Sequence, residues 1–539
     1  MSSPFASLLG TNYCPRDDEI AQIKALLVEP CLRLKSLDEE IVVMRKALDK
    51  LTEERDALNT YVEAHKSLIS PFRRLPRDIV QVIFLACLPT HRNCVMSAQE
   101  APILLGRICS SWRAISLSAP RLWSRLHVVK PTLPYGPYYM NSATTVRAYQ
   151  TMVAQRLKVA EAWLRRSGTC PLSISLQSSR HYDPRNAYDA PRTDPFLDIL
   201  IPFASRWQDI SVTIPSFAVQ ALLELTEHDV PLLESLTITV IDADSSIDPT
   251  PGSLLSAARL SRFSLTGGDF HHHQSSSLSL SWCNLTSLTL VPRDAPNCQI
   301  ILDILARCSR LRACKVGVAE HEGEHLQDSI VECLSLHSME VWCYSSPLDS
   351  SGRLLSRLSV PNLQDFTLGG REEPSASTSL ISSLATCTCL QSISIANGMF
   401  RNHELVDFLR GLPPSARRLR IAEQWHRSSL CPILGDNFFA SLELSPERSA
   451  ILPALKELAI TNNRELSDDA LLRFIISRMS TLRRVDITFE REMQVDILPS
   501  LQSFMESSGA QIFLAYRTDL GYDVSPYSGL PDSPRLRPR

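Results

Sequence analysis

Three adjacent histidines form one group of side chains in this sequence that could carry metal chemistry. His271, His272 and His273 lie in a Gly/Ser-rich segment, 267–277, that is typical of an exposed turn. Three neighbouring imidazoles on such a turn cannot readily meet one ion with a fixed geometry, and Asp269 is the only acidic ligand nearby. We therefore predict no metal site in this chain.

Cysteines form the second group of reactive side chains. The chain has 15 of them, and the only close pair is Cys387 and Cys389. Because no C-x-x-C motif and no zinc-finger spacing occurs, we expect most cysteines to be free thiols that pack as small apolar groups in a reducing compartment. A nucleophilic cysteine stays open, since the sequence alone cannot locate its histidine and acid partners.

Most motifs of common enzyme classes are missing from the sequence. It contains no phosphate loop, no dinucleotide-binding fingerprint and no nucleophile-elbow G-x-S-x-G, and the letters H-E-x-x-H occur once, at 321–325. We therefore predict a protein that is not an enzyme and that needs no cofactor.

The composition indicates an ordinary folded chain. Its 539 residues are 44% hydrophobic and 21% charged, which favours two or three folding units. A formal net charge of −3 provides no field that would attract nucleic acid or an anionic membrane. No run approaches the roughly 18 apolar residues of a membrane span, and residues 1–10 lack the basic start of a secretory signal. These features predict a cytoplasmic or nuclear protein without nucleic-acid or membrane partners.

Apolar residues recur with a seven-residue period after an N-terminal segment, 1–16, that we expect to be disordered. The a and d positions of these heptads are Leu34, Leu37, Ile41, Met44, Leu48, Leu51, Arg55, Leu58 and Val62. The pattern predicts a coiled-coil-like helix within 17–70, with a break in continuity at Pro30. The apolar seam would mediate self-association or fold back on the next domain, and the sequence favours neither.

A small helical domain is predicted over 71–130. Its first helix has Asp78 in the first turn, where the helix dipole favours a negative charge. The apolar face of this helix comprises Ile79, Val80, Ile83, Phe84 and Cys87. A second helix is expected to begin near Ala101-Pro102, with an apolar face of Leu104, Leu105, Ile108, Trp112 and Ile115.

Three fragments of this domain resemble the F-box family. They are Leu-Pro-Arg-Asp-Ile at 75–79, Ile-Cys-Ser-Ser-Trp-Arg at 108–113 and Leu-Trp at 122–123, in the order that the family shows. The sequence departs from the family in the longer segment between the two helices, 90–100. The resemblance implies a subunit that docks on a Skp-type adaptor, which links it to a Cullin scaffold.

The resemblance also implies which side chains face the adaptor and which pack inside. The implied adaptor residues are Leu75, Pro76, Ile79, Val80, Ile83, Phe84, Leu104, Leu105 and Ile108. Trp112 and Trp123 are expected to pack internally. The alternative is that the whole apolar stripe is core against the following domain, because an apolar stripe alone does not establish a partner.

A leucine-based pattern, L-x-x-L-x-L, repeats beyond a Pro- and Tyr-rich linker, 131–146, and a helical run through Trp163. Its units begin at Trp207, Leu233, Leu260, Leu285, Leu311, Leu336, Leu363, Leu390, Ala416, Leu455 and Leu482. Most steps are 25 to 27 residues, within the leucine-rich-repeat range of 20–29. The pattern predicts an irregular solenoid over 147–519 with a parallel sheet on its concave side.

Several details of the solenoid follow from the same pattern. Helices are expected at 300–308, 405–409 and 470–478, and a last strand at 511–516. The one long step, before Leu455, implies an insertion around 424–448, and only Asn463 keeps the asparagine of the repeat family. The tail, 520–539, is expected to be disordered.

Residues between the repeat leucines should face the concave side of the sheet. Its polar and charged members are Ser235, Thr237, Arg262, Ser287, Thr289, Lys315, Glu340, Trp342, Asp365, Thr367, Arg418, Arg420, Glu457, Arg484 and Asp486. We expect an unknown protein substrate to bind there, on residues that include Lys315, Trp342, Arg418, Arg420 and Arg484. The arginines would favour an acidic or phosphorylated segment, whereas a solvated charged face is the alternative.

The predicted fold class is thus α/β: a coiled-coil-like helix, a small helical F-box and an irregular leucine-rich-repeat solenoid. The predicted function is that of the substrate receptor of an SCF (Skp–Cullin–F-box) ubiquitin ligase. Such a receptor acts by proximity, and no bond is made or broken on it. The alternative is an F-box and repeat scaffold that binds partners without engaging a Cullin.

Overall fold

The computed structural model describes twelve stretches of the chain. They are residues 3–69, 71–131, 143–178, 194–242, 254–268, 280–319, 326–344, 350–370, 378–400, 404–422, 433–444 and 451–516. The three adjacent histidines, most of the predicted linker and the predicted tail lie outside them. The chain divides into two compact units, Met1–Val80 and Gln81–Arg539, with the boundary inside helix α2 (Arg77–Ala86).

The first unit consists mainly of one long helix, α1 (Asp17–Leu68). Its first turn is acidic, and the Glu19 carboxylate accepts a hydrogen bond from the backbone N–H of Arg16 at 2.8 Å, which caps the helix. The predicted break at Pro30 is wrong, because α1 continues through it. A proline removes one backbone hydrogen bond, and the turns on both sides keep theirs. The segment expected to be disordered includes a short 3-10 helix, η1 (Ala6–Leu8).

The segment that was predicted as a small helical domain forms several short helices. They are η2 (Pro71–Arg74), α2, α3 (Leu105–Ile108), α4 (Ser110–Leu117) and η3 (Pro120–Trp123). The second predicted helix is split at Cys109, whose backbone is extended (φ −156°, ψ 169°). Its Sγ accepts a hydrogen bond from the backbone N–H of Trp112 at 3.5 Å and so caps α4. We refer to residues 81–124 as the helical block.

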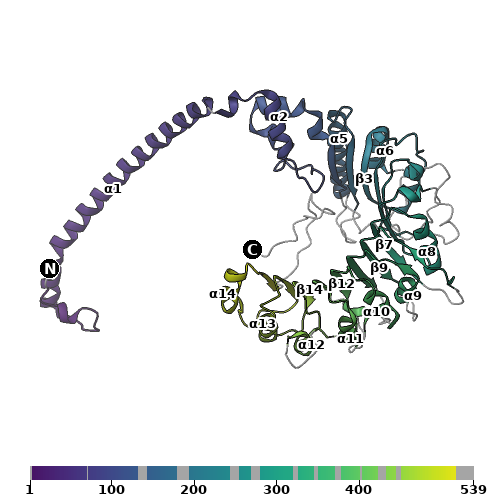
Figure 1. Ribbon diagram of the computed structural model, residues 1–539. Helices are drawn as coiled ribbons and strands as arrows, with labels where there is room; N and C mark the ends of the chain where they lie inside the picture. Colours follow the sequence, from purple (N-terminus) through teal and green to yellow (C-terminus); the bar gives the residue numbers. More distant parts are fainter. Residues whose placement is uncertain are drawn as a thin grey trace. The chain divides into compact units, whose positions relative to one another are not determined.

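The second unit is built around one open, 14-stranded parallel sheet whose strands follow one another in chain order (Figure 1). The strands are β1 (Arg125–Val129), β2 (Leu172–Gln177), β3 (Trp207–Ile214), β4 (Ser235–Val240), β5 (Arg262–Thr266), β6 (Ser287–Val291), β7 (Ala313–Val318), β9 (Ser338–Cys343), β11 (Asp365–Gly370), β12 (Ser392–Ala396), β13 (Arg418–Ala422), β14 (Glu457–Asn463), β15 (Arg484–Phe489) and β16 (Gln511–Tyr516). Every predicted repeat supplies one strand, and the predicted last strand is β16. The sheet starts earlier than predicted, since β1 and β2 lie before the first repeat and β1 falls within 71–130.

Helices connect the strands and cover the outer side of the sheet. The α-helices of this region are α5 (Ala143–Arg166), α6 (Pro195–Leu200), α7 (Ser216–Leu223), α8 (Cys298–Arg307), α9 (Ser350–Ser356), α10 (Thr378–Ala385), α11 (Glu404–Gly411), α12 (Asp436–Leu442), α13 (Asp468–Ser477) and α14 (Leu498–Ser508). Two short strands, β8 (Val331–Glu332) and β10 (Leu358–Ser359), pair separately. Figure 1 shows α8, α9, α10 and α11 along the outer side of the curved sheet. The three predicted helices are confirmed as α8, α11 and α13, and the predicted run through Trp163 is confirmed as α5.

The core lies between the sheet and these helices. In the 14-stranded sheet, the second residue of each strand from β4 to β15 is apolar, buried, and in register with the same residue of the next strand. These residues are Leu236, Phe263, Leu288, Cys314, Met339, Phe366, Ile393, Leu419, Leu458 and Val485. Full burial of one Leu or Phe side chain contributes about 2 kcal/mol, so the stacked repeats are held together chiefly by this ladder.

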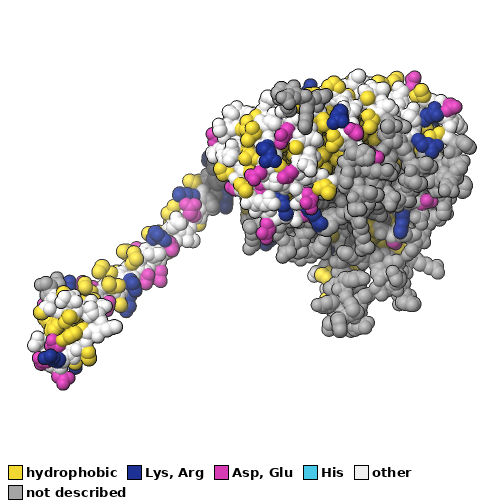
Figure 2. Space-filling model, turned by 90° about the horizontal axis from the view of Figure 1, so that it is seen from below, with side chains coloured by type: hydrophobic (Ala, Val, Ile, Leu, Met, Phe, Trp, Pro, Cys, Tyr) yellow, Lys and Arg dark blue, Asp and Glu magenta, His cyan; other side chains and the backbone are white. Residues whose placement is uncertain are grey.

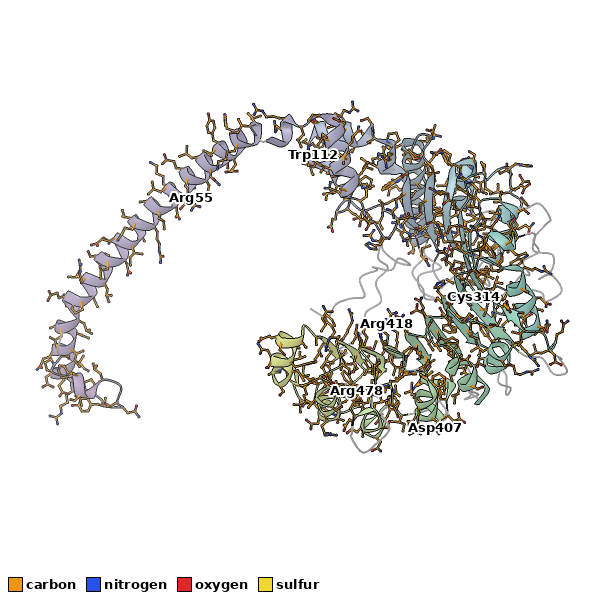
Figure 3. The ribbon with its side chains drawn as sticks, in the orientation of Figure 1. Arg55, Trp112, Cys314, Asp407, Arg418 and Arg478 are labelled. Carbon is orange, nitrogen blue, oxygen red and sulfur yellow. The ribbon has the colours of Figure 1, made fainter. Side chains whose placement is uncertain are left out.

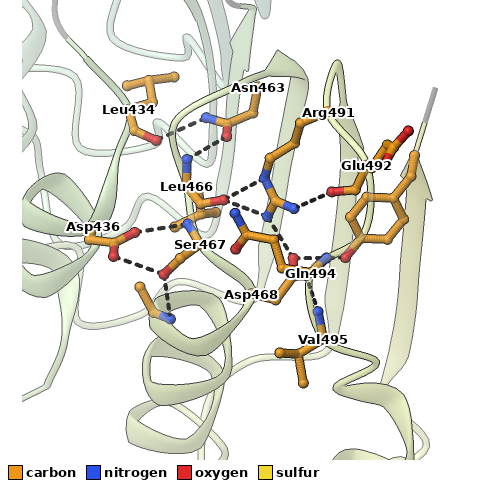
Figure 4. Close-up of polar contacts among 12 residues, drawn as sticks. Leu434, Asp436, Asn463, Leu466, Ser467, Asp468, Arg491, Glu492, Gln494 and Val495 are labelled. Atoms are coloured by element: carbon orange, nitrogen blue, oxygen red, sulfur yellow. Dashed lines mark hydrogen bonds and ion pairs between the residues drawn. The ribbon is translucent and has the colours of Figure 1, made fainter.

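The last repeats carry the insertion that the long step predicted. Helix α12 occupies part of this insertion. The buried side chain of Asn463 links the loop before α12 to the loop after β14. The Asn463 amide donates to the carbonyl oxygen of Leu434 at 2.9 Å and accepts from the backbone N–H of Leu466 at 3.0 Å (Figure 4). The one retained asparagine is therefore a structural link between two loops.

Candidate interaction surfaces

Helix α2 presents a mixture of exposed and buried apolar side chains. Ile79 is 44% exposed and Val82 is 62% exposed, whereas Val80 and Phe84 are buried. The Phe84 ring lies 5.0 Å, centroid to centroid, from the ring of Trp112 on α4. The two exposed residues are therefore available to a partner, and Phe84 is part of the internal packing.

Helices α3 and α4 add a second set of exposed apolar side chains. Leu104 and Ile108 are 41% and 55% exposed, and Leu117 on α4 is 43% exposed, whereas Leu105 is buried. Trp123 is also buried, and its indole N–H donates to the carbonyl oxygen of Ser116 at 2.8 Å.

The structure thus divides the nine residues implied at an adaptor surface into three groups. Pro76, Ile79, Leu104 and Ile108 are exposed, Leu75 and Ile83 are partly exposed, and Val80, Phe84 and Leu105 are buried. Sequence reasoning missed Val82 and Leu117. Helical spacing from Ile79 could have indicated Val82, which lies three residues further along α2.

The segment between the predicted F-box helices, 90–100, attaches the helical block to the sheet. The Asn93 amide donates to Ser175 Oγ at 3.2 Å and accepts from Ser173 Oγ at 2.9 Å. Both serines lie on β2, on the face that carries the polar residues. On β1, the backbone N–H of His127 donates to the carbonyl oxygen of Cys94 at 2.8 Å. The segment that departs from the F-box pattern is therefore the one that binds the helical block to the first two strands.

The polar face of the sheet changes character along its length. From β2 to β6 the row of residues in register is uncharged: Ser175, Ser211, Thr237, Ser264 and Thr289. In this row a charged side chain first appears at β7, with Lys315, whereas the neighbouring row already carries Asp209 on β3 and Arg262 on β5. Figure 3 shows Arg418 on the inner side of the curved sheet and Asp407, on α11, on its outer side.

A compact charged and aromatic cluster lies on β7 and β9. The Nζ of Lys315 is 2.6 Å from Glu340 Oε1 and 5.2 Å from the centroid of the Trp342 ring. The indole N–H of Trp342 donates to the same carboxylate. In register, Trp342 lies between Gly317 and Gly369, and a Cβ built at Gly369 would come within 3.1 Å of the indole. Because Gly369 has no side chain, the Trp342 ring has room on this face.

The three arginines predicted for substrate binding differ in their surroundings. Arg418 lies 3.3 Å from Asp365, and Arg484 lies 3.3 Å from Asp486. Both pairs are close to half exposed, where an ion pair contributes little. Arg420 is exposed, and no ion pair involves it within the described residues. The face is therefore mixed in charge rather than strongly basic.

The cysteines are free thiols throughout the described residues, but fewer are buried than we predicted. Six of the 14 described cysteines are buried, including Cys94, Cys314 and Cys333, and six are exposed. Burial raises the pKa of the Cys94 thiol to about 12 and that of Cys333 to about 11, so both stay protonated at neutral pH. Within the described residues, no group of three or more His, Cys, Asp or Glu side chains is arranged to hold a metal ion.

Comparison with known proteins adds no assignment to this geometry. No family model matches the chain, and no curated protein matches its sequence. Among the helices that the structure describes, none combines the length and the apolar character needed to cross a membrane.

Proposed function

We propose that the chain is the substrate receptor of an SCF-type ubiquitin ligase, with an F-box that binds a Skp-type adaptor and leucine-rich repeats that bind a protein substrate. The observation that carries the proposal is the placement of the F-box pattern. Its tryptophans pack inward or are partly covered, whereas Val82 and Ile108 remain exposed on short helices. Exposed apolar side chains grouped on a small helical segment are typical of a protein-binding surface.

The repeat sheet supports the second half of the proposal. A parallel sheet with a polar inner face offers a long surface on which an extended partner can bind. Among the residues predicted for this role, Trp342 and Arg420 fit best, because Trp342 is a partly exposed aromatic side chain and Arg420 has an exposed guanidinium. Arg418 and Arg484 are already paired with Asp365 and Asp486. To bind an acidic substrate, each arginine would have to leave this ion pair and form one with a carboxylate of the substrate.

The hydrogen bonds of Asn93 give the proposal a mechanical basis. They hold the helical block against β2, so an adaptor on the block and a substrate on the sheet would keep a fixed separation. The chain would then raise the effective concentration of a substrate lysine near the activated ubiquitin. Such a role belongs to the cytosol or the nucleus.

The experiment is co-purification of the full chain with a Skp-type adaptor and its Cullin. The test variant carries Val82→Asp and Ile108→Asp, both at exposed positions, so that the internal packing of Phe84 stays intact. The control is Ile476→Asp, because Ile476 is 51% exposed on α13, away from the F-box pattern. We expect the native chain and the control to retain both partners and the test variant to lose them.

Circular dichroism on all three proteins establishes that they are folded. If the native chain retains neither partner, the receptor hypothesis is rejected. The alternative that remains is a scaffold that does not engage a Cullin.

A further inference from the structure

Within its own unit, the apolar seam of α1 has no cover along its whole length. Every apolar a and d residue between Leu34 and Val62 is at least 37% exposed, and several exceed 60%. This stretch is about 43 Å long at 1.5 Å per residue. Figure 2 shows hydrophobic side chains at the surface of the long helix, between charged ones. A strip of this length without a cover within its own unit requires a partner.

The charges beside the seam identify the partner. In a parallel coiled coil, the g residue of one helix lies beside the e residue of the other, five positions further along, and these pairs set partner choice and orientation. The charged g residues Arg33 and Glu40 would meet the e residues Asp38 and Arg45 of a second copy. Both pairs are attractive. Within one chain, Arg33 and Glu40 are 3.8 Å apart and more than half exposed, so this contact competes little.

We propose that the chain forms a parallel, in-register homodimer through residues 34–62 of α1. The occupant of the seam is a second copy of the same helix. In an antiparallel pair that overlaps over the whole seam, Arg33 would lie near the other end of the partner helix and lose Asp38. A shift by one heptad would place Arg33 beside Arg45, which is repulsive. The charges therefore select both direction and register.

Arg55 at an a position agrees with this arrangement. It interrupts an otherwise apolar seam, and a single polar a residue favours one register at a cost in stability. Its guanidinium lies 2.7 Å from Asp56, and both side chains are exposed (Figure 3). In the in-register dimer, Arg55 would also face Glu54 of the second copy, which occupies the adjacent g position.

The first experiment is sedimentation equilibrium on the full chain. We expect a dimer for the native protein and a monomer for Leu48→Glu, which places a charge at an a position while keeping a good helix former. The matched control is Val43→Glu, because Val43 is 67% exposed on the same helix but lies outside the a and d positions. The control should remain a dimer.

The second experiment tests direction and register. One variant reverses the e charges, Asp38→Lys with Arg45→Glu, and another reverses the g charges, Arg33→Glu with Glu40→Arg. Each alone makes both pairs repulsive and should weaken self-association by about tenfold or more. An equimolar mixture restores attraction at every pair and should form a heterodimer of near-native affinity.

A native chain that is monomeric at micromolar concentration, or a mixture that associates no better than its components, would overturn the proposal. Neither outcome bears on adaptor binding, which is tested through Val82 and Ile108.

Discussion

The two edges of the 14-stranded sheet are stabilised by contacts of different kinds. At the first edge the contacts come from the helical block: Cys94 accepts a backbone hydrogen bond from His127 on β1, and Asn93 bonds to two serines of β2, about 80 residues away in sequence. At β16 they come from the last two repeats. Asp468, at the start of α13, is fully buried, lies 2.6 Å from Arg491 and accepts a hydrogen bond from the Tyr516 hydroxyl at 2.9 Å. Two backbone N–H groups, of Gln494 and Val495, donate to its other oxygen (Figure 4).

This difference separates a local cap from a connection between two parts of the second unit that are distant in sequence. In a stack of repeats each unit contacts only its neighbours, so a change near β16 should loosen the last repeats alone. A change at Asn93 should instead loosen the attachment of the helical block to the sheet. The following predictions test this contrast, and hydrogen exchange can locate each effect.

The largest effect is expected for Asp468→Ala. It removes one partner of a buried ion pair and leaves Arg491 without its carboxylate, which costs about 3–5 kcal/mol of local stability. Hydrogen exchange should lose protection in β15 and β16 and keep it in β1 to β6. A loss of protection that spreads evenly over the sheet would contradict the local cap.

A somewhat smaller effect is expected for Arg478→Met. The buried Arg478 guanidinium donates to the carbonyl oxygens of Leu442, Ile451 and Leu452 at 2.5–2.9 Å. Burial lowers its pKa to about 10, so it stays charged at neutral pH. Methionine keeps most of the volume but leaves three acceptors unsatisfied, at a cost of about 2–3 kcal/mol.

Denaturant unfolding, followed by exchange in α12 and α13, would measure this change. Arg478→Lys retains a charge and some donors, so its free energy of unfolding should fall by less than that of Arg478→Met. Equal decreases in the two variants would contradict the role of the three hydrogen bonds.

Acidification should weaken the same end of the sheet. Burial alone would raise the pKa of Asp468, but hydrogen bonds from Arg491, the two backbone N–H groups and Tyr516 lower it below its ordinary value of 3.8. The carboxylate therefore stabilises the fold above pH 4 and loses this contribution as the pH falls through its lowered pKa. Below this lowered pKa, we expect the free energy of local unfolding at β16 to be about 1–2 kcal/mol smaller. Asp468→Asn should be less stable at neutral pH and show a flatter pH dependence.

The sequence predicted the repeats better than it predicted their ends. Leucines at a nearly constant period define β3 to β15, because each occupies the same buried position in its unit. By contrast, β1 and β2 carry no such period, and their place depends on Asn93 and other contacts remote in sequence. The helical period likewise found the apolar faces of α2 and of the helical block. It could not distinguish Ile79, which is exposed, from Phe84, which is buried, because that depends on where Trp112 packs.

The network at Asp468 also escaped sequence analysis, since its members are spread over 49 residues, from Asp468 to Tyr516, and only the stacking of two repeats joins them. Local patterns thus determine which residues form an element, and tertiary contacts determine which of its faces stays free.

The smallest effect is expected at the connection to the helical block. Asn93→Ala removes the hydrogen bonds to Ser173 and Ser175, Ser173→Ala removes only the first of these, and each change should cost about 1 kcal/mol. Because the two side chains bond to each other, the double variant should cost less than the sum, with a coupling of about 0.5–1 kcal/mol. Ser394→Ala, on the same face at β12, is the control and should not couple with Asn93→Ala. Additive costs for Asn93 and Ser173 would mean that the two side chains do not hold the helical block to β2. An exchange experiment should then find β1 and β2 opening independently of the block.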